Sequence, residues 1–129
     1  AYVDLDNFKQ MSDQFGHSVG DEVLKKVSER LGSHLRPADV IGRMNGDEFV
    51  VIIGGEDRVA GRKTLEELVG SLSLLSQDHE RPVTASVGVA IYERPPILVD
   101  EMIRRADELM FAVKKSGKAN VKIEEISAS

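Results

Sequence analysis

The stretch Asp39-Val-Ile-Gly-Arg-Met-Asn-Gly-Asp-Glu-Phe-Val-Val-Ile-Ile53 decides how this chain folds. At its centre, Asn45-Gly46 separates two apolar runs. Asn-Gly in that context is a strong signal for a two-residue hairpin turn in which both residues have positive φ. We therefore predict a β-hairpin over residues 39–53, with both flanking runs forming buried strands. Asp47 and Glu48 then lie at the tip of the hairpin, where functional groups are often placed.

Apolar periodicity on either side of the hairpin predicts the remaining elements. Before the hairpin we expect a strand at 1–5, a helix at 8–15 that Gly16 ends, and a longer helix capped by Ser18 or Asp21. After it we expect a helix at 57–75, a polar loop at 77–81, a strand at 83–92, a helix at 97–115 and an edge strand at 121–123.

The predicted order of elements is β-α-α-β-β-α-β-α-β. Without its extra helix this is a ferredoxin-like βαββαβ unit, so the expected fold class is α+β, with a mainly antiparallel central sheet flanked by helices. We place those helices on one face of the sheet. The first strand of such a unit is central and lies beside the strands of the hairpin.

Length and composition narrow the class of protein. The 129 residues suit one domain with its own core, and the lack of cysteine excludes disulfides and thiolate metal sites. No apolar run approaches the roughly 18 residues of a membrane span, so we expect a cytoplasmic domain. The net charge of −5 argues against nucleic-acid binding. Because the sequence opens directly on a strand-like segment, we expect a longer multidomain protein, which other segments could anchor in a membrane.

Two carboxylates are expected to meet at one end of the sheet. Asp4 ends the first strand and Asp47 lies in the neighbouring hairpin, so with a backbone carbonyl they would form the hard oxygen site that Mg²⁺ prefers. The start of the next helix, Asn7-Phe8-Lys9, offers amides and a cation to phosphate. Together with the cluster Lys114, Lys115 and Lys118, the pattern indicates phosphoryl or nucleotidyl transfer.

Each of these signals also has a simpler interpretation. Asp4 and Asp6 are typical of solvated residues that follow a strand. The lysine cluster suits a solvated helix end, where cations complement the helix dipole. Asn45-Gly46 taken alone is simply a good turn. Only the joint occurrence of these features favours a functional site.

Five blocks of the chain resemble, in order and spacing, the signature blocks of the GGDEF family, the diguanylate cyclases. They are Asp4–Lys9, Phe15–Asp21, Arg43–Phe49, Thr84–Gly88 and the final helix from Ala106-Asp107 to Lys114 and Gly117. The resemblance implies a cyclase-like fold and a reaction that joins two GTP molecules into cyclic di-GMP with Mg²⁺, or Mn²⁺ as an alternative ion. It also implies a catalytic homodimer, an attached sensory or other signalling domain, and an N-terminal helix that this sequence lacks.

The resemblance assigns roles to individual residues. Asp4, Asp47 and the Leu5 carbonyl would ligate the metal, and Asp47 or Glu48 would help to activate the ribose 3′-hydroxyl. The nucleotide-binding residues would be Asn7, Phe8 and Lys9 near the phosphates, Ser12 and Asp21 at the guanine, Asn45 and Gly46 at the turn, and Lys114 and Lys118 at the β- and γ-phosphates. Arg36 and Asp39, within Arg36-Pro-Ala-Asp39, match the family's inhibitory site for cyclic di-GMP.

Four positions depart from the family pattern. Ser12 stands where the family has a guanine-binding Asn, and Asn45 replaces a glycine, which puts a side chain near the ribose. Lys118 replaces an Arg and loses bidentate phosphate geometry, and Ala119 replaces an Asn. These changes keep the metal site and weaken nucleotide recognition. They leave open a degenerate domain that binds GTP or cyclic di-GMP and regulates a partner domain without catalysis, or a cyclase-like domain for another nucleotide.

Overall fold

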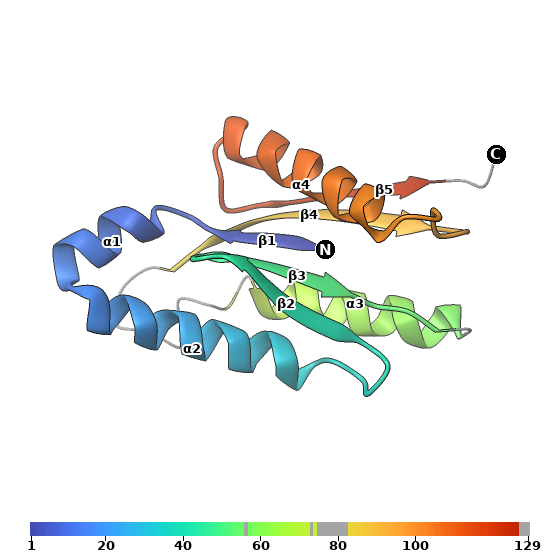
Figure 1. The fold of residues 1–129 in the computed structure, drawn as a ribbon, viewed down its shortest axis with the longest axis horizontal. Coiled ribbons are helices and arrows are strands. Elements are labelled where there is room, and N and C mark those ends of the chain that lie inside the picture. Colours follow the sequence, from blue (N-terminus) through green and yellow to red (C-terminus); the bar gives the residue numbers. More distant parts are fainter. Residues whose placement is uncertain (56, 73, 75–82, 127–129) are drawn as a thin grey trace.

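The computed structural model describes residues 1–55, 57–72, 74 and 83–126 (Figure 1). Its elements follow the predicted order: β1 (Tyr2–Leu5), α1 (Phe8–Phe15), α2 (His17–Ser33), β2 (Val40–Asn45), β3 (Glu48–Ile52), α3 (Arg58–Leu72), β4 (Ala85–Tyr92), α4 (Val99–Lys115) and β5 (Val121–Ile126). The predicted α+β class is confirmed. The loop predicted at 77–81 and the predicted end of the third helix at 75 lie outside the described residues.

β1 is the middle strand of a five-stranded sheet with the order β2-β3-β1-β4-β5. It pairs antiparallel with β3 on one side and with β4 on the other, whereas β5 runs parallel to β4 at the far edge. The carboxyl end of β1 therefore lies between the tip of the β2–β3 hairpin and the start of β4. The candidate site is built at this end of the sheet.

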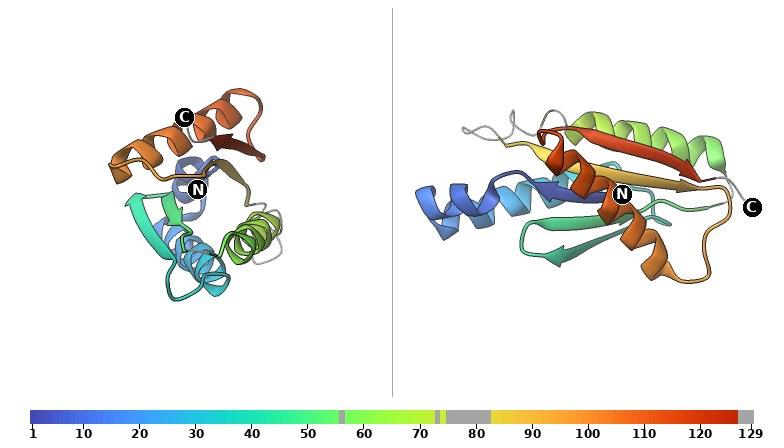
Figure 2. Two further views of the ribbon diagram at one scale, coloured as in Figure 1. Left: turned by 90° about the vertical axis from the view of Figure 1, so that its right-hand side faces the viewer. Right: turned by 90° about the horizontal axis from the view of Figure 1, so that it is seen from above.

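Helices cover both faces of the sheet, as the end-on view in Figure 2 shows. On one face α2 and α3 enclose the larger core, in which Val27, Leu31 and Leu68 pack with Val3 and Val87 of the strands. The prediction that the helices share one face is wrong. Alternate residues of β1 and β3 point to opposite faces, and each face carries buried apolar side chains, so each face needs its own cover.

The second face is covered by α4, whose Ala106 and Met110 pack on Tyr2 and Val50. The helix backbone comes very close to the sheet at Gly88 of β4. A Cβ atom at Gly88 would lie 2.1 Å from the Ala106 carbonyl oxygen and 2.3 Å from the Met110 nitrogen. The lack of a side chain at this position therefore sets the height of α4 above the sheet.

β2 is an edge strand rather than the buried strand that we predicted. It has β3 on one side and no strand on the other, and its residues are mostly exposed. β3 is buried along its middle, as expected. The apolar residues of β2 misled the prediction, because Val40 and Met44 are about half exposed at this edge.

The hairpin turn also differs from its prediction. The residues between the strands are Gly46 and Asp47, and neither Asn45 nor Gly46 has a positive φ. The register shifts between Arg43 and Asn45, so that Met44 is an extra residue on β2. Such a bulge increases the local right-handed twist, which a hairpin otherwise obtains from a turn with positive φ.

The two N-terminal helices meet at Gly16, which ends α1 and begins α2. Its φ of 98° allows the chain to change direction there. The predicted caps Ser18 and Asp21 lie inside α2, so that prediction is wrong. Within the described ranges, no helix is long and apolar enough to cross a lipid bilayer.

Candidate functional site

Carboxylates gather where β1 ends. Asp4 is paired with Glu48 of β3 on one side and with Ser86 of β4 on the other, so these three side chains lie on the same face of the sheet. The carbonyl oxygen of Asp47 accepts a hydrogen bond of 3.2 Å from the Leu5 amide, which ties the turn to the end of β1. As a result, Asp47 lies near enough to the Asp4 carboxyl to raise its pKa.

The environment of Asp4 disfavours its negative charge. Burial raises the pKa of Asp4 to about 7, and Asp47 and Glu48 contribute to the rise, whereas Lys114 opposes it. A divalent cation would relieve this repulsion, and two carboxylates with the Leu5 carbonyl are oxygen donors that suit Mg²⁺. In the described part of the chain, no group of three or more acidic or histidine side chains is already arranged as a metal site.

Asp6 is the most heavily bonded side chain of the site, and it is only 1% exposed. Its carboxylate accepts hydrogen bonds from Thr84 Oγ1 at 2.8 Å, Ser86 Oγ at 2.6 Å, Lys114 Nζ at 2.7 Å and the Ala119 amide at 2.9 Å. Burial acts to raise the pKa of Asp6, but the hydrogen bonds outweigh it and leave the pKa below its usual value. The simpler interpretation of Asp6 as a solvated residue is therefore wrong.

Two lysines from the end of α4 and the loop after it reach the end of β1. Lys114 Nζ lies 3.7 Å from Asp4 Oδ1 and 3.4 Å from the Leu5 carbonyl oxygen. Lys118 Nζ donates a hydrogen bond of 2.7 Å to Asn7 Oδ1. Asn7 and Lys118 both have left-handed backbone conformations, with φ of 56° and 65°, so the two loops that meet here are sharply turned.

The start of α1 completes the cationic side of the site. No side chain caps this helix, and its first turn carries no acidic residue. The first amides of a helix have no partners within the helix, so the amides near Asn7 and Phe8 can bind an anion. Lys9 is exposed in the same turn. Lys118 bonds to Asn7 and Lys114 reaches the neighbouring Leu5 and Asp6, so cations lie near a helix start that is suited to phosphate.

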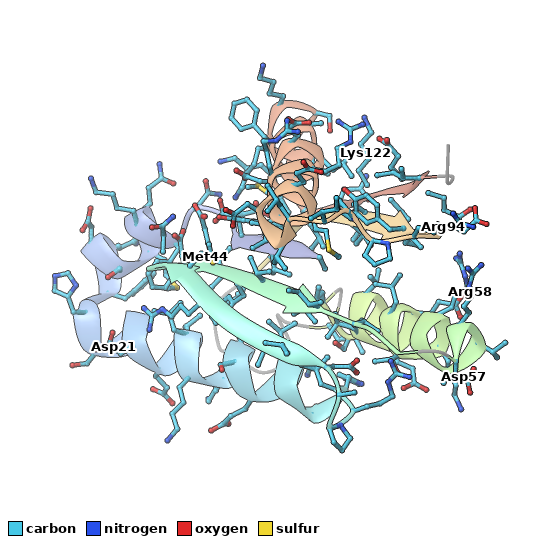
Figure 3. The ribbon with its side chains drawn as sticks, turned by 45° about the vertical axis from the view of Figure 1, so that its right-hand side comes forward. Asp21, Met44, Asp57, Arg58, Arg94 and Lys122 are labelled. Atoms are coloured by element: carbon cyan, nitrogen blue, oxygen red, sulfur yellow. The ribbon has the colours of Figure 1, made fainter. Side chains whose placement is uncertain are left out.

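The two residues assigned to the guanine are placed differently from each other. Asp21 lines an open depression of about 390 Å³ between α2 and the hairpin, together with Leu24, Arg43 and Phe49. Figure 3 shows Asp21 at the same end of the molecule as Met44 of β2. Ser12 is only 9% exposed and does not line the depression.

Ser12 instead lies between α1 and α2. Its Oγ is 3.4 Å from His17 Nδ1 and 3.1 Å from the position that a Cβ of Gly20 would take. A serine packed in this way is poorly placed to form hydrogen bonds with the edge of a nucleotide base.

The turn places Asn45 and Gly46 at the surface. Asn45 Nδ2 donates a hydrogen bond of 3.3 Å to Glu48 Oε2. A Cβ built on Gly46 would have no neighbour within 4 Å, so the turn faces open space. Arg43 Nε donates to the Gly46 carbonyl oxygen at 2.8 Å and holds the turn in shape.

Arg36 and Asp39 bond to each other between α2 and β2. Asp39 Oδ2 accepts hydrogen bonds from the Arg36 amide at 2.8 Å and from Arg36 Nε at 3.1 Å. Gly54 joins the pair, because its amide donates to Asp39 Oδ1 at 3.3 Å and its carbonyl oxygen accepts from Arg36 Nη2 at 2.6 Å. The Asp39 side chain is fully buried as a result.

A larger cavity, about 660 Å³, lies away from the carboxylates at the end of β1 and reaches Gly54, which bonds to Arg36 and Asp39. It is lined by the ends of β3 and β4 and the start of α3, and none of the predicted site residues borders it. Arg58 and Arg94 mark this end of the molecule in Figure 3, far from Asp21. The candidate site is identified by its converging charges and not by cavity size.

Comparison with protein families identifies the family of this chain. A family model described as "Diguanylate cyclase, GGDEF domain" matches residues 1–120. The chain therefore belongs to the GGDEF family, as its five sequence blocks predicted. The family is that of the diguanylate cyclases of cyclic di-GMP signalling.

The chain is also similar to individual proteins that contain this domain. The chain is 35% identical over 119 residues to the bifunctional diguanylate cyclase/cyclic di-GMP phosphodiesterase MucR of Pseudomonas aeruginosa; the match covers 91% of this chain and 17% of MucR. The GGDEF domain of DgcB from Caulobacter crescentus, solved in complex with cyclic di-GMP, has a TM-score of 0.74 and 29% identity, covering 95% of this chain and 74% of that one.

A second solved structure is the diguanylate cyclase SiaD of Pseudomonas aeruginosa in complex with its activator SiaC. Its TM-score is 0.78 at 30% identity, and the match covers 95% of this chain and 48% of SiaD. The chain spans less than a third of the length of the curated relatives MucR, DgcP and DgcT.

Proposed function

We propose that this domain is a Mg²⁺-dependent diguanylate cyclase that condenses two GTP molecules into cyclic di-GMP. The observation that carries the proposal is the meeting of the Asp4 and Asp47 carboxyls opposite Lys114 at the end of β1. It combines paired oxygen ligands with a cation in one place, which is the arrangement that nucleotidyl transfer requires.

The chain's own residues would act by binding and positioning. The amides at the start of α1, with Lys9, Lys114 and Lys118, would hold the triphosphate, and Asp21 would accept hydrogen bonds from the guanine. Asp4, Asp47 and the Leu5 carbonyl would hold Mg²⁺, which when bound neutralises phosphate charge.

In the reaction, the ribose O3′–H bond breaks while O3′ forms a bond to the α-phosphorus of the partner's GTP. Pyrophosphate leaves with the electron pair of the broken Pα–O bond. Asp47 or Glu48 would assist removal of the proton. Each domain holds one GTP, so two domains must face each other, and we propose that an attached signalling domain controls this pairing.

A second candidate is a degenerate domain that binds GTP or cyclic di-GMP without catalysis. The burial of Ser12 against Gly20 favours it, because Ser12 does not line the depression that Asp21 lines. In that case the metal site would persist without productive turnover.

The test is synthesis of the product. The domain, held as a dimer by a fused coiled coil, is incubated with GTP and Mg²⁺, and the nucleotides are separated by chromatography. We expect cyclic di-GMP with two pyrophosphates per product. The variant Asp47→Ala should make none and keep its circular dichroism spectrum, whereas Asp100→Ala, an exposed change in the first turn of α4, should keep activity. GTP binding without product would favour the second candidate.

A further inference from the structure

Tyr2 reaches the active-site carboxylates from the protein interior. It is 5% exposed, and its ring packs with Val50, Ala106 and Met110 beneath α4. Tyr2 is paired with Val50, and Glu48 lies two residues before Val50 on the same face of β3. Diagonal neighbours on an antiparallel pair are within reach of an aromatic side chain. The Tyr2 hydroxyl accordingly donates a hydrogen bond to Glu48 Oε2.

Asn45 reaches the same oxygen from the surface. Its Nδ2 donates to Glu48 Oε2 at 3.3 Å, from the edge strand on the other side of β3. Glu48 Oε2 thus has one donor from the core and one from the turn. Among the described residues, no hydrogen bond to Glu48 Oε1 is found, so this second oxygen is available to a ligand.

Tyr2 is well suited to remain a donor. Burial raises the pKa of Tyr2 well above its usual value, and the hydrogen bond to Glu48 and the negative charges of Glu48, Asp107 and Asp4 add to the rise. Among so many carboxylates, two neutral donors are what hold Glu48 in one orientation.

We propose that Tyr2 is a positioning residue for Glu48, with Asn45 as the second donor, so that Oε2 is fixed and Oε1 is presented to the nucleotide. This inference rests on the proposed cyclase function. The inference assigns a role to Asn45, which departs from the family signature, because Asn45 supports the carboxylate of Glu48 that the reaction uses. Tyr2 lies outside the residues that the family blocks single out.

The kinetic test is Tyr2→Phe, which removes the hydroxyl and keeps the ring. We expect kcat for cyclic di-GMP synthesis to fall about tenfold, while KM for GTP changes less than about twofold, because the nucleotide contacts are untouched. Tyr92→Phe is the matched control, since Tyr92 is the other tyrosine and lies at the opposite end of β4. It should leave both constants unchanged.

Two further variants separate positioning from general damage. Asn45→Ala, at an exposed position, should lower kcat in the same direction. In a Glu48→Gln background, Tyr2→Phe should cause no further loss, because its effect passes through the carboxylate. Equal effects of Tyr2→Phe and Tyr92→Phe, or a rise in KM with kcat unchanged, would overturn the proposal.

A readout without activity keeps the two proposals distinguishable. The Asn45 side-chain amide resonances report its bond to Glu48, and we expect Tyr2→Phe to shift them while Tyr92→Phe does not. If the parent domain makes no cyclic di-GMP but this shift occurs, the cyclase proposal fails and the two-donor support of Glu48 stands. If the resonances do not move, the support is absent.

Discussion

Lys114 Nζ donates a hydrogen bond of 2.7 Å to Asp6 Oδ1, although the two residues are 108 positions apart in the chain. The bond joins the end of α4 to the end of β1. Among the described ion pairs, Lys114 is the only cation near the Asp4 carboxylate, and the bond to Asp6 fixes its position. Asp6 thus determines where the cation of the candidate site lies.

We expect Asp6→Ala to lower the free energy of unfolding by about 2–3 kcal/mol, because a buried carboxylate with a charged partner is lost. Cyclase activity should fall as Lys114 loses its anchor. Urea unfolding followed by circular dichroism measures the first effect. Asp13→Ala, an exposed change on α1, is the control and should stay within about 0.5 kcal/mol of the parent. Equal stability of the two variants would contradict the role of Asp6.

GTP should bind more weakly to this chain than to a Ser12→Asn, Asn45→Gly double variant. The added amide can meet the guanine, and the glycine removes a side chain near the ribose. One or two hydrogen bonds predict a gain of about 2–10-fold in Kd. Calorimetric titration with GTP measures the change, and ATP serves as the control ligand. Equal or tighter binding by the parent would refute this account of the two departures.

The pair formed by Arg36 and Asp39 should make stability depend on pH. Burial acts to raise the pKa of Asp39, but hydrogen bonds from Arg36 and Gly54 outweigh it, so the folded-state pKa is lowered. The contribution is then fully present above the unfolded-state pKa of about 3.9 and is lost as the pH falls through the lowered folded-state value. Urea midpoints at about pH 7 and about pH 2.5 should show a smaller difference in Asp39→Asn than in the parent. An unchanged difference would rule out this linkage.

We further predict that cyclic di-GMP binds at Arg36 and Asp39. Because Asp39 is fully buried and bonded to Arg36 and Gly54, the ligand must open this pair to reach it. The Gly54 amide would lose its acceptor, so nuclear magnetic resonance titration should move Gly54 together with residues 36–39. A response confined to the residues at the end of β1 would show that the motif is structural in this chain.

Much of the fold could be predicted because it depends on periodicity. The order of all nine described elements followed from apolar spacing and from the positions of glycine. The errors arose where tertiary context decides the outcome. Val40 and Met44 are apolar but lie at an edge, and nothing local reveals which strand of a hairpin is covered. The bulge at Met44 replaced the turn that Asn45-Gly46 favours on its own.

The site was predictable to the extent that its residues stand at strand and helix ends. Asp4 and Asp47 were placed together from topology alone. The role of Asp6 was missed because its partners Thr84, just before β4, and Ser86, within β4, lie 78 and 80 residues further along the chain. The alternating hydroxyl residues Thr84 and Ser86, where the chain enters β4, were the available signal. Tyr2 gave no signal, because a tyrosine in a buried strand is ordinary until its hydroxyl is seen beside Glu48.

The close contact at Gly88 supports the backbone of α4 at one point along the helix. Lys114 lies four residues beyond Met110, about 6 Å along the helix axis, so its position depends on the height of the helix at this contact. A single methyl group added at Gly88 would push α4 away from the sheet and move the Lys114 ammonium away from Asp6, although the methyl group would touch no charged residue. In this domain, therefore, Gly88 governs the position of the Lys114 ammonium. Substitutions that harm the candidate site are expected also at residues that carry no functional group.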